Sequence, residues 1–196
     1  MSGYSNNRFY VALVHHPVVD KNGQTIASAV TNLDLHDIAR VCRTYGVKGY
    51  YIITPLEDQR VLVNRILSHW MTGAGGTYNP KRRQALDLVR VCGSFGEMRD
   101  DLHRTYGKPP KTVATTARRN MGTLTYDRLR SMLNESTAPV VLALGTAWGL
   151  SPAFMAEADY ILDPLVGSGD YNHLSVRSAV SIMLDRLLGQ GNCRMR

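Results

Sequence analysis

Short apolar runs recur along the chain, and they predict β-strands. The clearest is PVVLAL at residues 139–144, which is wholly apolar, as expected of a strand buried on both faces of a sheet. The runs FYVALVH and GYYIIT are similar, and Pro55 would end the second of them. Strands are predicted over residues 9–15, 49–54, 88–93, 111–115, 139–144 and 160–162.

The segments between these runs carry apolar residues at helical spacing, together with polar residues that can cap a helix. Asn32 or Asp34 is predicted to open a helix that runs to about Tyr45. Ser94 and Glu97 have the spacing of a capping box. Further helices are predicted over residues 57–70, 95–106, 125–133 and 176–187, with others beginning near residues 81 and 152.

The stretch TGAGGTYNPKRR, at residues 72–83, interrupts this pattern. Three glycines and a proline within so short a span predict a mobile loop. Three basic residues close the stretch where the next helix begins.

Strands that alternate with helices predict one α/β domain over residues 1–196, with residues 191–196 as a flexible tail. The expected architecture is a mostly parallel sheet with helices on both faces. Ligands bind such sheets beyond the carboxyl ends of the strands, which directs attention to the loops that follow them.

Composition narrows the choice of partners and compartment. Lys and Arg number 23 against 16 Asp and Glu, so the net charge is +7, which fits either a polyanionic partner or a well-solvated surface. The three cysteines, Cys42, Cys92 and Cys193, favour a reducing cytoplasm over a disulfide framework because they are odd in number and far apart. No membrane or metal partner is expected, since there is neither a long apolar run nor a zinc-ligand spacing.

Three loops that follow predicted strands carry glycine or small polar residues, at residues 114–120, 144–152 and 165–175. Neither a GxGxxG fingerprint nor a GxxxxGK[ST] phosphate loop is present in them. Their backbone groups could read the edge of a flat ring such as adenine, with glycine allowing close approach. The alternative is that all three are ordinary turns.

Three stretches, in order, resemble the motifs of the SPOUT (SpoU-TrmD) superfamily of RNA methyltransferases. The stretch AVTNLDLHDIARVCRTYGVKGYYIIT is similar to the first motif through Asn32, Arg40 and Gly46. VVLALGTAWGLSP resembles the second motif and YNHLSVRSAVSIML the third. The resemblance is nearest to a compact bacterial group with little beyond the catalytic domain.

This resemblance implies a deep trefoil knot at the C-terminus, a homodimer, and S-adenosylmethionine as the cofactor. It gives Arg40 a role in activating a ribose 2′-hydroxyl or binding its phosphate, and it leaves Asp170 as a candidate base for a guanine-N1 methylating enzyme. The residues that it assigns to the cofactor are Leu144, Gly145, Thr146, Gly149, Gly167, Leu174, Ser175 and Ala179. Leu165, Asn172 and His173, in the loop before the last helix, complete the expected pocket.

The expected function is S-adenosylmethionine-dependent methylation of a nucleotide in tRNA or rRNA. The residues expected to contact RNA are Asn32, Lys81, Arg82, Arg83, Arg118 and Arg119. One alternative is a SPOUT-fold protein that binds RNA or a partner without catalysis. Another is an unknotted nucleotide-binding α/β protein.

Overall fold

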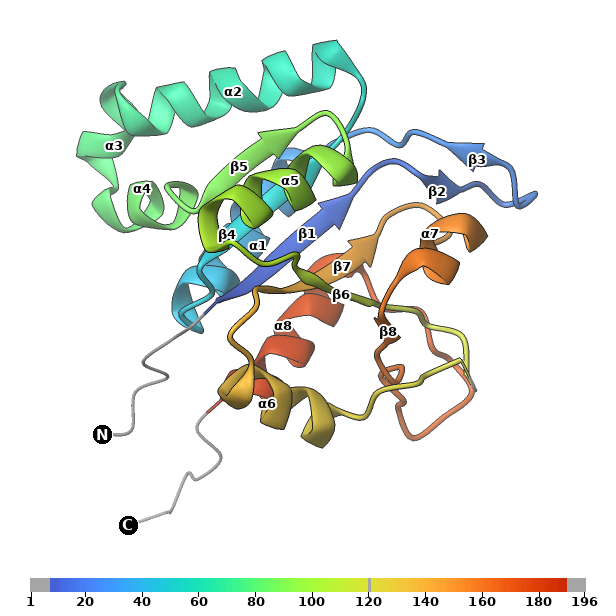
Figure 1. The fold of residues 1–196 in the computed structure, drawn as a ribbon. Coiled ribbons are helices and arrows are strands. Elements are labelled where there is room, and N and C mark those ends of the chain that lie inside the picture. The colour runs from blue at the N-terminus through green and yellow to red at the C-terminus, as the bar shows by residue number, and fades with distance from the viewer. Residues whose placement is uncertain (1–7, 120, 190–196) are drawn as a thin grey trace.

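A computed structural model of the chain describes residues 8–119 and 121–189, so the tail expected at residues 191–196 lies outside the described residues (Figure 1). The strands are β1 (Phe9–Val14), β2 (Val18–Val19), β3 (Thr25–Ile26), β4 (Gly49–Ile53), β5 (Val89–Cys92), β6 (Lys111–Ala114), β7 (Val140–Gly145) and β8 (Tyr160–Ile161). The helices are α1 (Asn32–Thr44), α2 (Glu57–Met71), α3 (Ala74–Tyr78), α4 (Pro80–Leu86), α5 (Phe95–Tyr106), α6 (Tyr126–Glu135), α7 (Pro152–Glu157) and α8 (Val176–Leu188).

Within the described residues, six strands form one parallel sheet in the order β5-β4-β1-β7-β6-β8. The central strand β1 pairs with β4 on one side and β7 on the other. Val14 lies level with Ile53 and with Gly145, so three strands end at the same edge. The predicted parallel α/β sheet is therefore confirmed.

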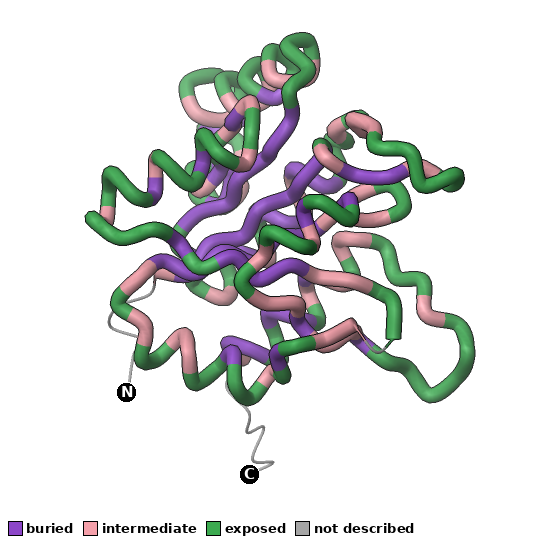
Figure 2. Tube along the Cα trace, turned by 45° about the vertical axis from the view of Figure 1, so that its right-hand side comes forward, coloured by how far each residue is buried: buried purple, intermediate pink, exposed green. Residues whose placement is uncertain are grey.

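Helices cover both faces of this sheet. Apolar side chains of α1, α4, α6 and α8 pack on one face, and those of α5 and α7 pack on the other. Every residue of β1 and β4 is buried, and Figure 2 shows this burial running through the centre of the molecule. A strand covered on both sides gains from apolar residues at every position, which is why these runs do not alternate with polar residues.

The capping box predicted at the start of α5 is confirmed in its main bond. The Ser94 hydroxyl accepts from the backbone N–H of Glu97 at 3.1 Å. The Glu97 carboxylate reaches back to the N–H of Gly93 at 2.7 Å, one residue earlier than the standard box.

The cap predicted for α1 is wrong. Thr31 is the N-cap, because its hydroxyl accepts from the N–H of Asp34 at 3.1 Å. Asn32 is already the first helical residue. The Asp34 side chain instead accepts a hydrogen bond from the Thr31 hydroxyl at 2.7 Å, and this leaves its other oxygen for a partner elsewhere.

The mobile loop predicted at residues 72–83 is also wrong, because most of this stretch forms α3 and the start of α4. Asn79 caps α4 by accepting from the N–H of Arg82, and Pro80 occupies the first helical position. Gly75 and Gly76 are buried in α3. A Cβ at Gly75 would lie 2.7 Å from His69 Nε2 and 3.0 Å from Trp70 Cε3. The glycines therefore serve close packing against the end of α2 rather than chain mobility.

Beyond the end of β1, the strands β2 and β3 form a short antiparallel hairpin, which the sequence did not reveal because two-residue strands carry no periodic signal. The strand order reverses between β1 and β7, since the chain leaves β1 for β4 on one side and leaves β7 for β8 on the other. In open parallel sheets, such a reversal creates a crevice at the carboxyl ends of the strands. None of the helices described in Figure 1 is long and apolar enough to cross a membrane.

Candidate functional site

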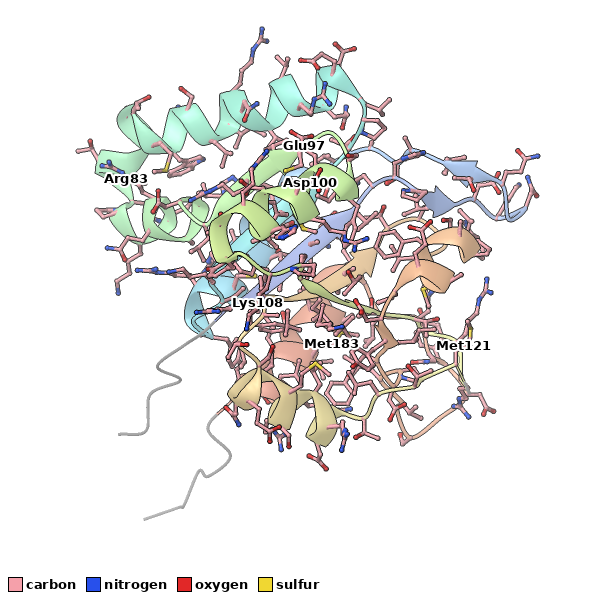
Figure 3. All side chains as sticks on the ribbon, viewed as in Figure 1. Arg83, Glu97, Asp100, Lys108, Met121 and Met183 are labelled. Atoms are coloured by element: carbon pink, nitrogen blue, oxygen red, sulfur yellow. The ribbon has the colours of Figure 1, made fainter. Side chains whose placement is uncertain are left out.

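A cavity of about 880 Å³ opens at the carboxyl edge of the sheet, in the crevice where the strand order reverses. It is lined by the loops that follow β6 and β7, by the segment before α1, and by the loop that leads into α8. Figure 3 labels two of its lining residues, Met121 after β6 and Met183 on α8, on the side of the molecule away from α2–α4. Most small-molecule sites in proteins have volumes in this range.

Ten of the eleven residues expected to bind a cofactor line this cavity. They are Leu144, Gly145, Thr146, Gly149, Leu165, Asn172, His173, Leu174, Ser175 and Ala179. Gly167 does not line it, and neither does Asp170, the candidate base. Both are exposed, because the segment around residues 166–171 extends into solvent between β8 and α8. Both residues thus lie outside the cavity lining in this structure, and their roles stay predictions.

The backbone of the loop after β7 packs closely against itself at the cavity. A Cβ at Gly145 would lie 2.6 Å from the backbone nitrogen of Leu150, so only glycine fits without moving the loop. Gly149 has a φ of 108°, a conformation that favours glycine. The β2 strand holds the loop, because Val19 donates to the Gly149 carbonyl at 2.9 Å and accepts from the Trp148 N–H at 3.1 Å.

A partly buried chain of polar side chains runs from the end of β1 to this loop. His15 Nδ1 lies 3.0 Å from the Ser28 hydroxyl, which lies 2.5 Å from the Thr146 hydroxyl. Thr146 in turn donates to the carbonyl of Val14 at 3.2 Å. His15 is fully buried, and this burial lowers its pKa to about 4, so the ring is neutral near pH 7. The network fixes the Thr146 side chain at the cavity wall.

The loops after β6 and β8 lie side by side next to the cavity. Asn172 donates its side-chain N–H to the Ala117 carbonyl at 2.9 Å, and Arg119 donates to the Gly169 carbonyl at 3.3 Å. Further along, the Asp163 N–H donates to the Leu124 carbonyl at 2.9 Å. Hydrogen bonds thus join the segment at residues 163–172, which leads into α8, to the loop at residues 117–124, which follows β6.

An ion pair joins α8 to α1 at the cavity wall. Arg177 Nη1 lies 2.8 Å from Asp34 Oδ1, and Arg177 Nε lies 3.5 Å from Asp37 Oδ2. Asp34 is buried, and it is the only carboxylate among the described residues that line the cavity.

A second hollow, a groove of about 550 Å³, lies between α1, α2 and α4. Of the residues expected to contact RNA or act in catalysis, it brings together Asn32, Arg40 and Arg82. Arg118 lines the first cavity instead, and Arg119 bonds to Gly169. Lys81 and Arg83 are exposed and line neither hollow; Figure 3 places Arg83 beside α3.

The groove also contains residues that the sequence interpretation missed, namely His36, Arg65, His69 and Trp70. His36 lies four residues from both Asn32 and Arg40, so helical spacing alone could have placed it on their face. No local signal in the sequence showed that α4 would bring Arg82 over the ring of Trp70.

Comparison with known protein families matches residues 8–189 to a family described as SAM-dependent RNA methyltransferase. The chain belongs to this family. S-adenosylmethionine is the methyl donor of the family, and RNA is the acceptor. The recognition of an RNA methyltransferase from the sequence motifs is therefore confirmed.

Two relatives show the extent of the similarity. An uncharacterized protein of Aquifex aeolicus is 39% identical over 188 residues, which cover 96% of this chain and 92% of that protein. A protein named tRNA (guanine-N(1)-)-methyltransferase from Oleidesulfovibrio alaskensis is 46% identical over 180 residues, which cover 92% of this chain but 42% of that protein. The chain thus spans less than half the length of the second relative.

A solved structure shows the same fold. The A. aeolicus TrmH/SpoU tRNA modifying enzyme superposes with a TM-score of 0.55 at 17% identity, over 94% of this chain and 75% of that one. The parallel α/β arrangement of the SPOUT type is therefore shared at low sequence identity.

Proposed function

We propose that the cavity at the carboxyl edge of the sheet holds S-adenosylmethionine and that the chain methylates an RNA nucleotide presented at its mouth. The observation that carries this is the position of the cavity, at the β1–β7 reversal and between the segments that resemble SPOUT motifs two and three. The family match to residues 8–189 supports the same chemistry.

The residues present suit this cofactor. Leu144, Leu165 and Met183 offer apolar surface to a flat ring, and Gly145 and Ala179 allow its close approach. Backbone N–H and C=O groups of the loop after β7 can read an adenine edge, and the Thr146 hydroxyl is held in place by the network from His15. Most of the described lining residues are small or apolar, and few carry a charge, which suits a cofactor with an uncharged adenosine part.

When bound, the sulfonium supplies an electrophilic methyl group, and the protein must orient donor and acceptor for in-line transfer. The acceptor also loses a proton. Asp34 is engaged by Thr31 and Arg177, and its role is to position α8 against α1. We assign binding of the acceptor nucleotide to Arg118 at the cavity. Contacts with the adjoining RNA are assigned to Asn32, Arg40 and Arg82 in the groove and to the exposed Lys81 and Arg83 outside it.

A knotted C-terminus and a homodimer belong to the same proposal. The bonds that tie residues 161–172 to the preceding loop at residues 115–124 support a threaded final segment, which would be an exception to the rule that chains avoid knots. The exposed apolar side chain of Ile182 on α8 supports pairing of two copies through this helix. Ile182→Glu should shift the mass measured by light scattering from dimer to monomer. The cytoplasm, where RNA and the cofactor are both available, is the expected location.

The test of the cofactor site is calorimetric titration with S-adenosylmethionine and S-adenosylhomocysteine. We expect both to bind with one site per chain, and absence of heat for both ligands at high micromolar concentration would refute the proposal. Transfer of labelled methyl groups to bulk RNA, followed by mass spectrometry of its nucleosides, then identifies the acceptor. If the product is N1-methylguanosine, this chain has the activity named for its longer relative. If the product is a 2′-O-methyl nucleoside, the two proteins differ in the atom that they methylate.

A further inference from the structure

The groove between α1, α2 and α4 combines cations with aromatic rings in one hollow. Arg40, Arg65 and Arg82 line it together with Trp70. Among the described lining residues, Asp37 is the only acid, and it already lies 3.5 Å from Arg177. Three arginines against one carboxylate, which is already paired, leave the groove with an excess of positive charge.

The aromatic part of the groove is held in a fixed arrangement. The Arg82 guanidinium carbon lies 4.8 Å from the centroid of the Trp70 ring, which is cation–π geometry. The rings of His36 and His69 meet the indole edge-on, with centroids 5.6 and 5.4 Å away. Gly75 packs so closely on His69 and Trp70 that a larger residue would displace them. The planar guanidinium of Arg82 thus lies over the face of the Trp70 indole.

One polar group in the groove lacks a partner. Nδ1 of His36 is buried and accepts or donates no hydrogen bond within the described structure. Burial lowers the pKa of His36, and the charge of Arg82 acts in the same direction while that of Asp37 opposes it, so the uncharged ring is favoured.

We propose that this groove is a second RNA subsite, which binds a single-stranded nucleotide next to the one that is methylated. Its arginines contact the phosphate, and the base stacks on the Arg82–Trp70 pair. Unpaired RNA bases are commonly stacked on aromatic rings or guanidinium planes, and a paired base would be unable to enter. This inference rests on the proposed function only for its choice of RNA as the ligand.

The groove is separate from the methyl-transfer cavity yet adjacent to it. The two hollows share no lining residue, but they lie on either side of the first turn of α1. Asn32 and Leu33 face the groove, whereas Thr31 and Asp34 face the cavity. A nucleotide in the groove would therefore place its neighbour near the cavity mouth, and the groove would select for unpaired RNA around the target.

The experiment measures binding of a short fluorescein-labelled single-stranded RNA by anisotropy across a series of salt concentrations. Arg65→Gln and Arg82→Gln should each weaken binding about fivefold and lower the slope of log Kd against log salt by about 0.7 for each phosphate that is no longer neutralised. Arg82→Lys should keep the slope but not the affinity, because lysine retains the charge and loses the stacking plane. Arg99→Gln serves as the matched control, because it removes the same charge at an exposed position of α5, on the opposite face of the sheet.

Equal affinities and slopes for the groove variants and Arg99→Gln would overturn the inference. So would equal affinities for Arg82→Lys and the wild type, because stacking would then play no part. Calorimetry with S-adenosylmethionine on the same variants should give the wild-type Kd. If the wild type binds RNA through the groove but does not bind the cofactor, the proposed function fails and the subsite stands.

Discussion

Arg177 of α8 donates to the carboxylate of Asp34 in α1 over 2.8 Å, although the two residues are 143 positions apart. The second carboxylate oxygen accepts from the Thr31 hydroxyl at 2.7 Å. The Asp34 side chain is 9% exposed and that of Arg177 33%, so the pair is partly shielded from water. It fixes the first turn of α1, which separates the cavity from the groove, against α8.

This pair should contribute measurably to stability. In a double-mutant cycle with Asp34→Asn and Arg177→Gln, we expect a coupling of about 1–2 kcal/mol in the free energy of unfolding, discounted for the partial exposure of Arg177. Urea unfolding of the four proteins measures it. The exposed pair Asp127–Arg130 on α6 is the control, and its coupling should stay near about 0.3 kcal/mol. Equal couplings for the two pairs would contradict a special role for Arg177.

The stability of the fold should fall in mild acid through His15. Burial lowers the folded-state pKa of His15 to about 4, below its unfolded value, so the unfolded state binds the proton first as the pH falls. The stabilisation that neutral His15 provides is intact above about pH 6.5 and is lost progressively as the pH falls to about 4. The free energy of unfolding should fall by about 2 kcal/mol between about pH 7.5 and about pH 5.

Urea unfolding at these two pH values tests this on the wild type and on His15→Asn. The variant should be less stable at neutral pH, but its loss on acidification should be about 2 kcal/mol smaller. His103→Asn, at an exposed position of α5, should lose as much as the wild type. An unchanged acid loss in His15→Asn would show that other groups cause it.

A bulky residue at position 179 should block the cofactor. Ala179 lines the cavity on α8, so Ala179→Phe places a ring in the space assigned to adenosine and should weaken S-adenosylmethionine binding at least about tenfold by calorimetry. Ile182→Phe, three residues further along α8 on a partly exposed position outside the lining, should bind normally. Equal binding by both variants would place the cofactor elsewhere.

Gly76 should tolerate no side chain. A Cβ there would overlap the carbonyl oxygen of Trp70, which is backbone and cannot turn aside. Gly76→Ala should therefore lower the free energy of unfolding by about 2 kcal/mol, measured in urea. Gly96→Ala in the first turn of α5 meets only Ser94 Oγ, at 3.7 Å, and should raise stability by about 0.5 kcal/mol. A neutral Gly76→Ala would mean that α3 does not pack this closely against the backbone of Trp70.

Arg40 should affect methyl transfer without affecting cofactor binding, because it lines the groove and not the cavity. We expect Arg40→Gln to lower the rate of labelled-methyl transfer to RNA at least about tenfold while the Kd for S-adenosylmethionine stays at the wild-type value. Arg43→Gln, one turn further along α1 and outside both hollows, is the charge-matched control. Similar rates for the two variants would mean that Arg40 takes no part in positioning the RNA.

Much of this protein could be predicted from local pattern. The buried strands β1, β4 and β7 are apolar at nearly every position, and Ser94 and Thr125 carry their own cap bonds, so these elements were found. The glycine-rich stretch was misinterpreted as a mobile loop because its glycines serve a contact with His69 and Trp70 that composition does not reveal. Gly167 lies outside the cavity lining because of the path of its loop, which no pattern in the sequence predicts.

The order of strands and helices, the buried runs and the three family motifs were thus determined by the sequence itself, because periodicity, capping and glycine placement act over a few residues. The tertiary structure alone decided which distant residues meet. It joined Arg177 to Asp34, carried Arg82 over Trp70, and linked His15 to Thr146 through Ser28. Such contacts depend on how helices pack and where loops cross, and those choices follow from burial of the whole core rather than from any short segment.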